Sequence, residues 1–169
     1  TTDFTKSGFG TPTAAIIILC EANSGANPAV NAIMGIGFWD GTNQRAVAAS
    51  GTDNLADALT ARTSDDSYGA MVTSNIAGVP TAVASYTVSA VTDGIRLTMT
   101  VDATTIERFA TVILLAGVSS KAGTFTPNAT QNSTTESASL GHAPELIFFI
   151  CVGSTTADTL ATNAILSFG

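Results

Sequence analysis

The chain has 169 residues and a formal net charge of −7, with 45% hydrophobic and only 11% charged residues. This length fits one domain with a single core, and no apolar run approaches the roughly 20 residues that a membrane-spanning helix needs. Only six residues are Lys or Arg, which excludes the clustered basic face that nucleic-acid binding requires.

Short stretches rich in Ile, Val, Thr and Phe alternate with Gly, Asn, Asp and Ser, a pattern typical of antiparallel β proteins. They predict an all-β fold of about ten short strands, an antiparallel β-sandwich or a jelly-roll-like barrel. In chain order the expected strands are residues 14–20, 32–39, 44–49, 70–76, 83–90, 95–101, 109–116, 123–127, 146–152 and 164–168. Gly35 and Gly37 fall inside a strand, where they indicate a bulge or a close backbone approach.

One segment, residues 53–61, has a helical pattern: Asp53 can cap it, and Leu55, Ala58 and Leu59 share one face. The polar residues 62–69 and 128–139 on either side of the central strands predict loops.

The clearest local pattern is a hairpin around Asp93-Gly94, because apolar and polar residues alternate on both arms and Asp-Gly favours a tight turn. We expect the inward face to hold Tyr86, Val88, Ile95, Leu97 and Met99. The outward face is then Thr87, Ser89, Arg96 and Thr98.

The two ends of the chain resemble each other. PTAAIIILC at Pro12 is echoed by PELIFFIC at Pro144, and NAIMGIGF at Asn31 by NAILSFG at Asn163. The prolines and the asparagines give a period of 132 residues, while the cysteines imply a shift of one residue between them; the alternative is a chance likeness of two strands of similar composition. Residues 1–169 are therefore expected to form a single sandwich domain. In it, residues 1–122 are a first repeat unit, and residues 123–169 are a truncated second unit.

The second unit carries a nearly continuous apolar run, Leu146, Ile147, Phe148, Phe149 and Ile150. Such a run requires burial on both faces, so we expect an assembly strand that completes the sandwich or pairs with a neighbouring subunit. Deletion of residues 140–169 is then expected to unfold or aggregate the protein, or to abolish its assembly.

The order of these motifs resembles repetitive structural proteins encoded by tailed bacteriophages. The resemblance rests on the Pro-led apolar strand, the Asn-Ala-Ile strand, TNQRAV at Thr42, TARTS at Thr60, the hairpin, VDAT at Val101 and LLAG at Leu114. It implies a virion component, with no catalytic residues to carry over. The second unit is truncated here, and Met99 stands where such hairpins more often have an aromatic residue.

Candidate chemistry is sparse. His142 is the single histidine and is expected in a turn, and Asp65-Asp66 is expected in a solvated acidic loop. Neither pattern matches a catalytic triad, a zinc site or a calcium loop, so no catalytic residue, cofactor or metal is predicted. Cys20 and Cys151 sit inside apolar runs and are expected to be buried free thiols, with a Cys20–Cys151 disulfide as the alternative.

Trp39, Asp40 and Asn43 are the candidate carbohydrate contacts, because an aromatic ring beside polar side chains can bind a sugar face. The more common role of a single tryptophan at a strand end is in the core or at its rim.

The low fraction of charged residues and the many small neutral side chains favour an assembled protein over a monomer. The sequence therefore predicts a non-catalytic structural protein of a virus or phage particle, as a capsid decoration, fibre or tail-associated subunit. Its expected partners are copies of itself and other structural proteins of the particle, with a surface glycan as a further candidate, and neither nucleic acid nor membrane. The alternatives are a subunit of an extracellular filament or pilus that uses strand donation, and a carbohydrate-binding adhesin domain.

Overall fold

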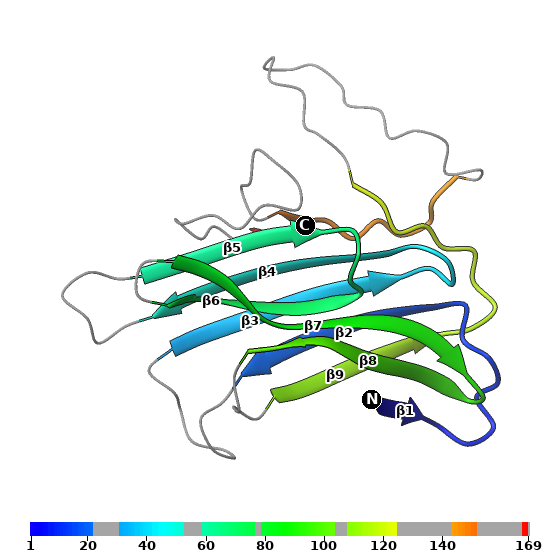
Figure 1. Cartoon of the computed structure of the whole chain (residues 1–169). Helices are drawn as coiled ribbons and strands as arrows, with labels where there is room; N and C mark the ends of the chain where they lie inside the picture. The colour runs from blue at the N-terminus through cyan, green and yellow to red at the C-terminus, as the bar shows by residue number, and fades with distance from the viewer. Residues whose placement is uncertain are drawn as a thin grey trace.

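The computed structural model describes residues 1–21, 31–52, 59–76, 79–103, 108–124, 143–151 and 167–168. Within them lie eleven strands and no helix, arranged as two antiparallel sheets of five and four strands and one small strand pair (Figure 1). The all-β antiparallel sandwich predicted from the sequence is confirmed. We call the five-stranded sheet the large sheet and the four-stranded sheet the small sheet.

The large sheet has the order β5-β4-β3-β2-β9. Its strands are β5 (Leu59–Asp65), β4 (Gln44–Thr52), β3 (Asn31–Trp39), β2 (Ala14–Glu21) and β9 (Arg108–Leu115). The small sheet has the order β1-β8-β7-β6. Its strands are β1 (Thr2–Thr5), β8 (Gly94–Asp102), β7 (Val79–Val91) and β6 (Ala70–Ile76). The separate pair is β10 (Ile150–Cys151) with β11 (Ser167–Phe168).

The core lies between the two sheets and is built from the alternate residues that each strand turns inward. Ile17 and Leu19 of β2 are at most 2% exposed and belong to one cluster with Val72, Val83 and Ile95 of the small sheet. Each such side chain contributes about 1.5 to 3 kcal/mol when it leaves water, so this cluster dominates the stability of the sandwich.

The two sheets approach unusually closely where β6 crosses β3 and β4. A Cβ atom at Gly35 would collide with the carbonyl oxygen of Met71, and one at Gly37 with that of Gly69. The neighbouring strand β4 contributes the fully buried Ala46 and Ala48 at the same interface. The predicted close backbone approach at Gly35 and Gly37 is confirmed, and the ladders of β3 run without a register shift.

The hairpin of β7 and β8 is confirmed, with Val91 opposite Gly94 and Asp93 at φ 61°. Tyr86, Val88, Ile95 and Leu97 are buried as predicted, but Met99 is 38% exposed and the expectation for it is wrong. The β7–β8 register shifts next to Tyr86, the partner of Met99, and such an irregularity re-aims side chains. Gly94 is required by β1, because a Cβ there would collide with the carbonyl oxygen of Phe4.

Several other expectations fail. Residues 59–65, expected as the end of a helix and a polar loop, form β5, while residues 53–58 lie outside the described part. Of the two expected C-terminal strands, residues 146–152 and 164–168, the described part contains only Ile150–Cys151 and Ser167–Phe168 as strand. Residues 123 and 124 are not strand; the rest of that expected strand, 125–127, and the expected loop 128–139 are not described.

Candidate assembly surface

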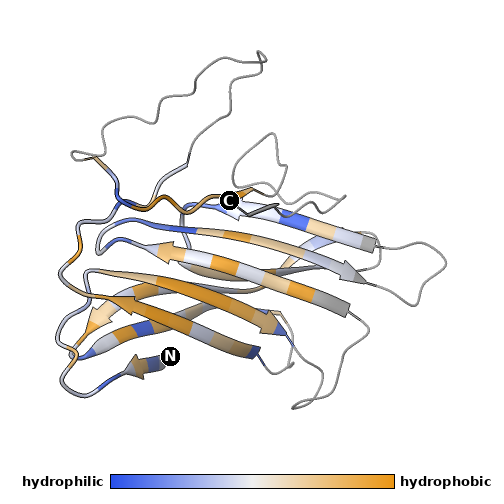
Figure 2. Cartoon of the chain, turned by 180° about the vertical axis from the view of Figure 1, so that it is seen from behind, coloured by the Kyte–Doolittle hydropathy of each residue, from blue (hydrophilic) through white to orange (hydrophobic). Residues whose placement is uncertain are grey.

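The outer face of the large sheet is apolar. Because Ile17 and Leu19 point into the core, their neighbours Ile16, Ile18 and Cys20 on β2 point outward. Figure 2 shows this face from behind, with hydrophobic residues along β2 and β9 and a more hydrophilic β5. Part of this face is covered within the chain, since Ile36, opposite Ile18, is only 4% exposed.

One apolar row crosses this face from edge to middle. Ile113 of β9 is opposite Ile16 of β2, which is opposite Phe38 of β3. The ring of Phe148 continues the row, since its centroid lies 5.9 Å from that of Phe38 at an interplanar angle of 56°. The C-terminal segment therefore rests on the outer face of its own sheet at this point.

The segment with the predicted assembly strand is otherwise exposed. Leu146 is 84% exposed, Ile147 and Phe148 are each 51% exposed, and Phe149 is 42% exposed, while Ile150 is half-buried in β10. The expectation that this apolar run is buried on both faces is wrong for the described chain. In the described residues the ladder of this segment begins only at Ile150, where β10 pairs with β11. The side chains of Leu146 and Ile147 thus remain largely exposed to solvent.

Strand β9 is the second exposed apolar element, and it was not predicted as one from the sequence. It is an edge strand of the large sheet, so its outer edge has no ladder partner in the described part of the chain. Phe109 is 45% and Ile113 46% exposed on one face, while Val112 and Leu114 line the core on the other. The signal present in the sequence was the run FATVILL, apolar on both faces, in the last strand of the first unit.

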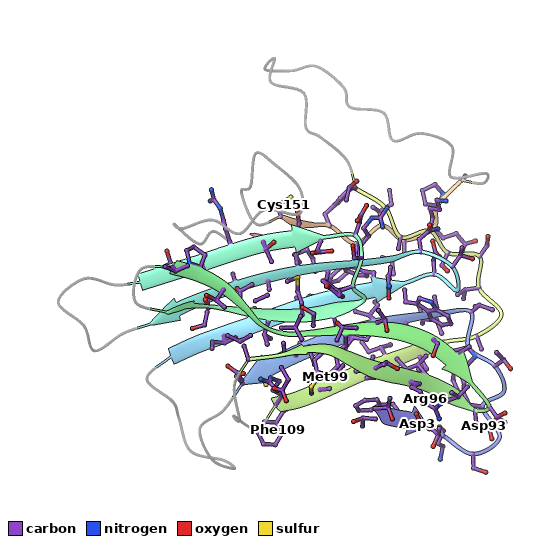
Figure 3. All side chains as sticks on the ribbon, in the orientation of Figure 1. Asp3, Asp93, Arg96, Met99, Phe109 and Cys151 are labelled. Atoms are coloured by element: carbon purple, nitrogen blue, oxygen red, sulfur yellow. The ribbon has the colours of Figure 1, made fainter. Side chains whose placement is uncertain are left out.

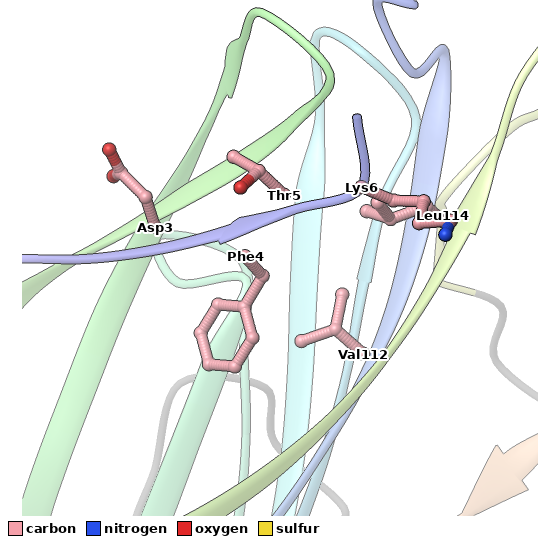
Figure 4. A pocket seen from close by; sticks show the side chains of 6 residues that line it. All are labelled: Asp3, Phe4, Thr5, Lys6, Val112 and Leu114. Carbon is pink, nitrogen blue, oxygen red and sulfur yellow. The ribbon is translucent and has the colours of Figure 1, made fainter. Parts of the chain in front are cut away.

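An open cleft of about 420 Å³ separates β9 from β1, where the two sheets diverge. Phe4 of β1 points toward Val112 of β9 across this gap, and Lys6 lies near Leu114 (Figure 4). Asp3 and Thr5 complete the lining. The cleft holds no convergent set of polar groups that could orient a small ligand, and we assign it to the open side of the sandwich between β1 and β9.

The structure separates the roles of the three candidate carbohydrate residues. Trp39 is 6% exposed and belongs to the core cluster, so its ring presents no open face for a sugar. Asp40 accepts hydrogen bonds from the backbone N–H groups of Thr42, Asn43 and Ala122 at 2.9, 2.6 and 2.9 Å, and from the amide of Asn43 at 3.0 Å. Asp40 and Asn43 therefore shape the β3–β4 turn and bind the segment after β9 to it.

Folding lowers the pKa of Asp40 below its ordinary range. Burial alone would raise this pKa, but the N–H of Ala122, the amide of Asn43 and the N–H groups of Asn43 and Thr42 together outweigh it. The carboxylate is held ionised by hydrogen bonds, which marks it as a structural anchor.

One charge network, buried at Arg108 and Glu21 and exposed at Asp102, joins the two sheets. Arg108 donates to Glu21 at 3.1 Å, to Asp102 at 3.1 Å and to the carbonyl of Val83 at 3.4 Å. Burial opposes the charge on Arg108, but Tyr86, Glu21 and Asp102 raise its pKa above the ordinary value. Each of these partners stabilises the cation, so Arg108 stays charged and ties β9 to the small sheet.

Both cysteines are free thiols and both are exposed, so the expectation of burial is wrong. Cys20 lies on the outer face of β2, and Cys151 is the last residue of β10. Asp65 accepts a hydrogen bond from the N–H of Ser67 at 2.7 Å and shapes the turn after β5. His142 lies outside the described residues.

Within the described ranges no three His, Cys, Asp or Glu side chains are grouped so that they could hold a metal ion. The described residues also contain no helix that is long and apolar enough to cross a membrane. Comparison with protein-family models, with curated proteins and with solved structures gives no match.

Proposed function

We propose that the chain is a non-catalytic structural subunit of a virus or phage particle, a capsid decoration, fibre or tail-associated protein that acts by β-sheet packing and self-assembly. The observation that carries this proposal is the pair of exposed apolar elements, Leu146–Phe149 and the edge strand β9. Large exposed apolar patches in soluble proteins mark interaction sites. The virion itself is supported by the motif order that resembles repetitive phage proteins.

A filament subunit that uses strand donation is the second candidate. It is favoured by one observation, that Leu146, Ile147 and Phe148 have exposed apolar side chains and precede the described ladder of β10. The adhesin alternative has less support, because the ring of Trp39 is in the core.

Sedimentation analysis of the purified chain over a wide range of concentrations tests the self-assembly. We expect the average mass of the particles in solution to rise with protein concentration. A charged fraction of only 11% and exposed apolar side chains both favour association. A chain that stays monomeric throughout contradicts the proposal. Electron microscopy of the native source with an antibody against the chain then separates the two candidates: label on a shell or tail supports the particle, and label along a cell-surface fibre supports the filament.

A further inference from the structure

The resemblance between the two ends of the chain extends to strand register. In the C-terminal pair, Ile150 is opposite Phe168 and Cys151 is opposite Ser167. Subtraction of the 132-residue period gives Ile18 opposite Ile36 and Leu19 opposite Gly35, which are the observed partners in the β2–β3 ladder. With the period set by the prolines and the asparagines, the β10–β11 pair therefore has the register of β2–β3, while Cys151 lies one position away from the equivalent of Cys20.

The same 132-residue period indicates which kind of strand would pair with the C-terminal segment. Leu146 to Phe149 correspond to Ala14 to Ile17 of β2, which pair with Leu115 to Val112 of β9. In the first unit Ala14, Ala15 and Ile17 are at most 3% exposed, whereas Leu146 to Phe149 are 42% to 84% exposed. A strand of the β9 type is thus the element that would cover the segment.

The chain offers such a strand in β9, an edge strand of the large sheet. Phe148 of the segment packs on Phe38 of β3, and β2 lies between β3 and the edge strand β9. Figure 3 labels Cys151, at the end of the segment, near the top of the view and Phe109 of β9 near the bottom. The segment therefore lies over the middle of its own sheet and not along the free edge of its own β9. A second copy can supply a β9 edge without this constraint.

The other edges of the two sheets are less suited to receive a strand. Strand β5 carries Arg62 and Asp65, and β1 has only four residues, of which Asp3 is paired with Arg96. Strand β6, the second edge of the small sheet, has a register shift between Val72 and Thr73. Strand β9 has eight residues and an unbroken ladder to β2. Its one charge, Arg108, is bound to Glu21 and Asp102. It lacks the proline, the exposed lysine and the bulge that block edge-to-edge pairing.

We propose that Leu146–Cys151 of one copy adds as an antiparallel strand to the free edge of β9 in a second copy. The sheet order becomes β5-β4-β3-β2-β9 followed by β10 and β11 of the neighbour, so β9 lies between two hairpins of the same kind. Donor and acceptor are different surfaces, and the contact is therefore heterologous and adds copies in a row. This inference rests on the proposed self-assembly and specifies its contact.

Two variants of the full chain block one surface each. Thr111→Lys places a charge on the exposed outer face of β9 and disables the acceptor, while the double variant L146K/F148K disables the donor. Val79→Lys, at a 62% exposed position on β7, is the matched control. Circular dichroism and thermal unfolding establish that each variant is folded, and sedimentation analysis gives its mass.

We expect the wild-type chain and Val79→Lys to form assemblies larger than dimers, and each blocked variant alone to stay monomeric. An equimolar mixture of the two blocked variants forms dimers only, because one copy retains the tail and the other retains the edge. Association of L146K/F148K alone, as self-pairing of β9 would give, overturns the inference, and so does a mixture that stays monomeric. In both of those cases assembly of the wild type leaves the proposed function standing, whereas a monomeric wild type overturns both.

A peptide covering residues 143–152 provides a second measurement that needs no folded variant. Added in excess to the wild-type chain, it occupies the β9 edge and shortens the assemblies, while a peptide of the same composition in scrambled order leaves their mass unchanged. Equal effects of the two peptides, or no effect of either, overturn the inference.

Discussion

The carboxylate of Asp93 accepts hydrogen bonds from the backbone N–H of Gly10 at 2.8 Å and of Gly8 at 3.2 Å. Its carbonyl oxygen accepts another from the N–H of Lys6 at 2.8 Å. One turn residue of the β7–β8 hairpin, labelled in Figure 3, thus holds the N-terminal segment that contains β1. Asp93 achieves this with φ at 61°, a conformation that Asp tolerates better than most side chains.

The variants Asp93→Gly and Asp93→Ala separate the contribution of the carboxylate hydrogen bonds from that of the backbone angle. Glycine removes the hydrogen bonds of the carboxylate and tolerates the backbone angle, while alanine loses both, so we expect Asp93→Ala to be the less stable by about 1 kcal/mol. Both should loosen β1, which amide exchange of Phe4 and Thr5 will detect. Equal stability of the two variants would mean that the backbone angle carries no strain.

Gly35→Ala is expected to be strongly destabilising, because its Cβ would collide with the carbonyl oxygen of Met71. Overpacking of this kind costs about 1 to 3 kcal/mol, and here the obstacle is backbone that cannot rotate away. Gly51→Ala is the matched control, since nothing lies within 4 Å of its added Cβ. We expect urea denaturation to show a large loss of stability for the first variant and little change for the second; similar losses would contradict the close approach of the sheets.

Period-two patterning predicted much of the sandwich. The strands that begin at Ala14, Gln44 and Ala70 were located with at most three residues of error at either end. These segments are apolar on at least one face, and the glycines of β3 revealed the close approach of the sheets. The strands β1 and β5 were missed, because Thr2–Thr5 and Leu59–Asp65 are mostly polar edge strands whose backbone pairing with β8 and β4 leaves little trace in composition.

The assembly surface was predictable only in part. The apolar run at Leu146 was recognised, but hydropathy alone cannot distinguish a buried strand from one that awaits a partner. Exposure of Phe109 and Ile113 follows from the place of β9 at the end of the sheet order, a property of the topology. Burial of Trp39 likewise depends on the alternation of β3 about Gly37, which turns the ring inward.

Asp40→Asn should lower stability at neutral pH, by about 1 kcal/mol, because a neutral amide is a weaker acceptor for the N–H groups of Thr42, Asn43 and Ala122. The pKa of Asp40 is lowered on folding, so its contribution is complete above the pKa of an unfolded aspartate, about 3.9, and is lost as the pH falls toward the folded-state pKa. Urea denaturation at a series of pH values should therefore show the gap to wild type narrowing in acid.

Glu145→Gln controls for the change in net charge, since it removes a negative charge at an exposed position. It should match wild type across the same pH series. A gap for Asp40→Asn that persists unchanged at low pH would show that altered packing, and not the ionised carboxylate, is responsible.

A chain that ends after Thr124 should keep the sandwich and lose the assembly. In the described part of the chain every buried hydrophobic residue lies at or before Ala122, and the hydrogen bond from Ala122 to Asp40 is retained. The truncation removes the packing of Phe148 against Phe38, an aromatic pair worth about 0.5 to 1.5 kcal/mol. Thermal unfolding should therefore remain cooperative, with a midpoint lowered by a few degrees, about what a loss of 1 kcal/mol gives in a domain of this size.

The truncated chain should also act as a cap in mixtures. It keeps the β9 edge and lacks the donor segment, so it can receive a tail but cannot offer one. Sedimentation of mixtures with the full chain should show assemblies that shorten as the truncated fraction rises, while truncated chains alone stay monomeric. A truncated chain that unfolds would place the C-terminal segment in the core after all, and one that still forms large assemblies would show that self-association uses a different surface of the sandwich.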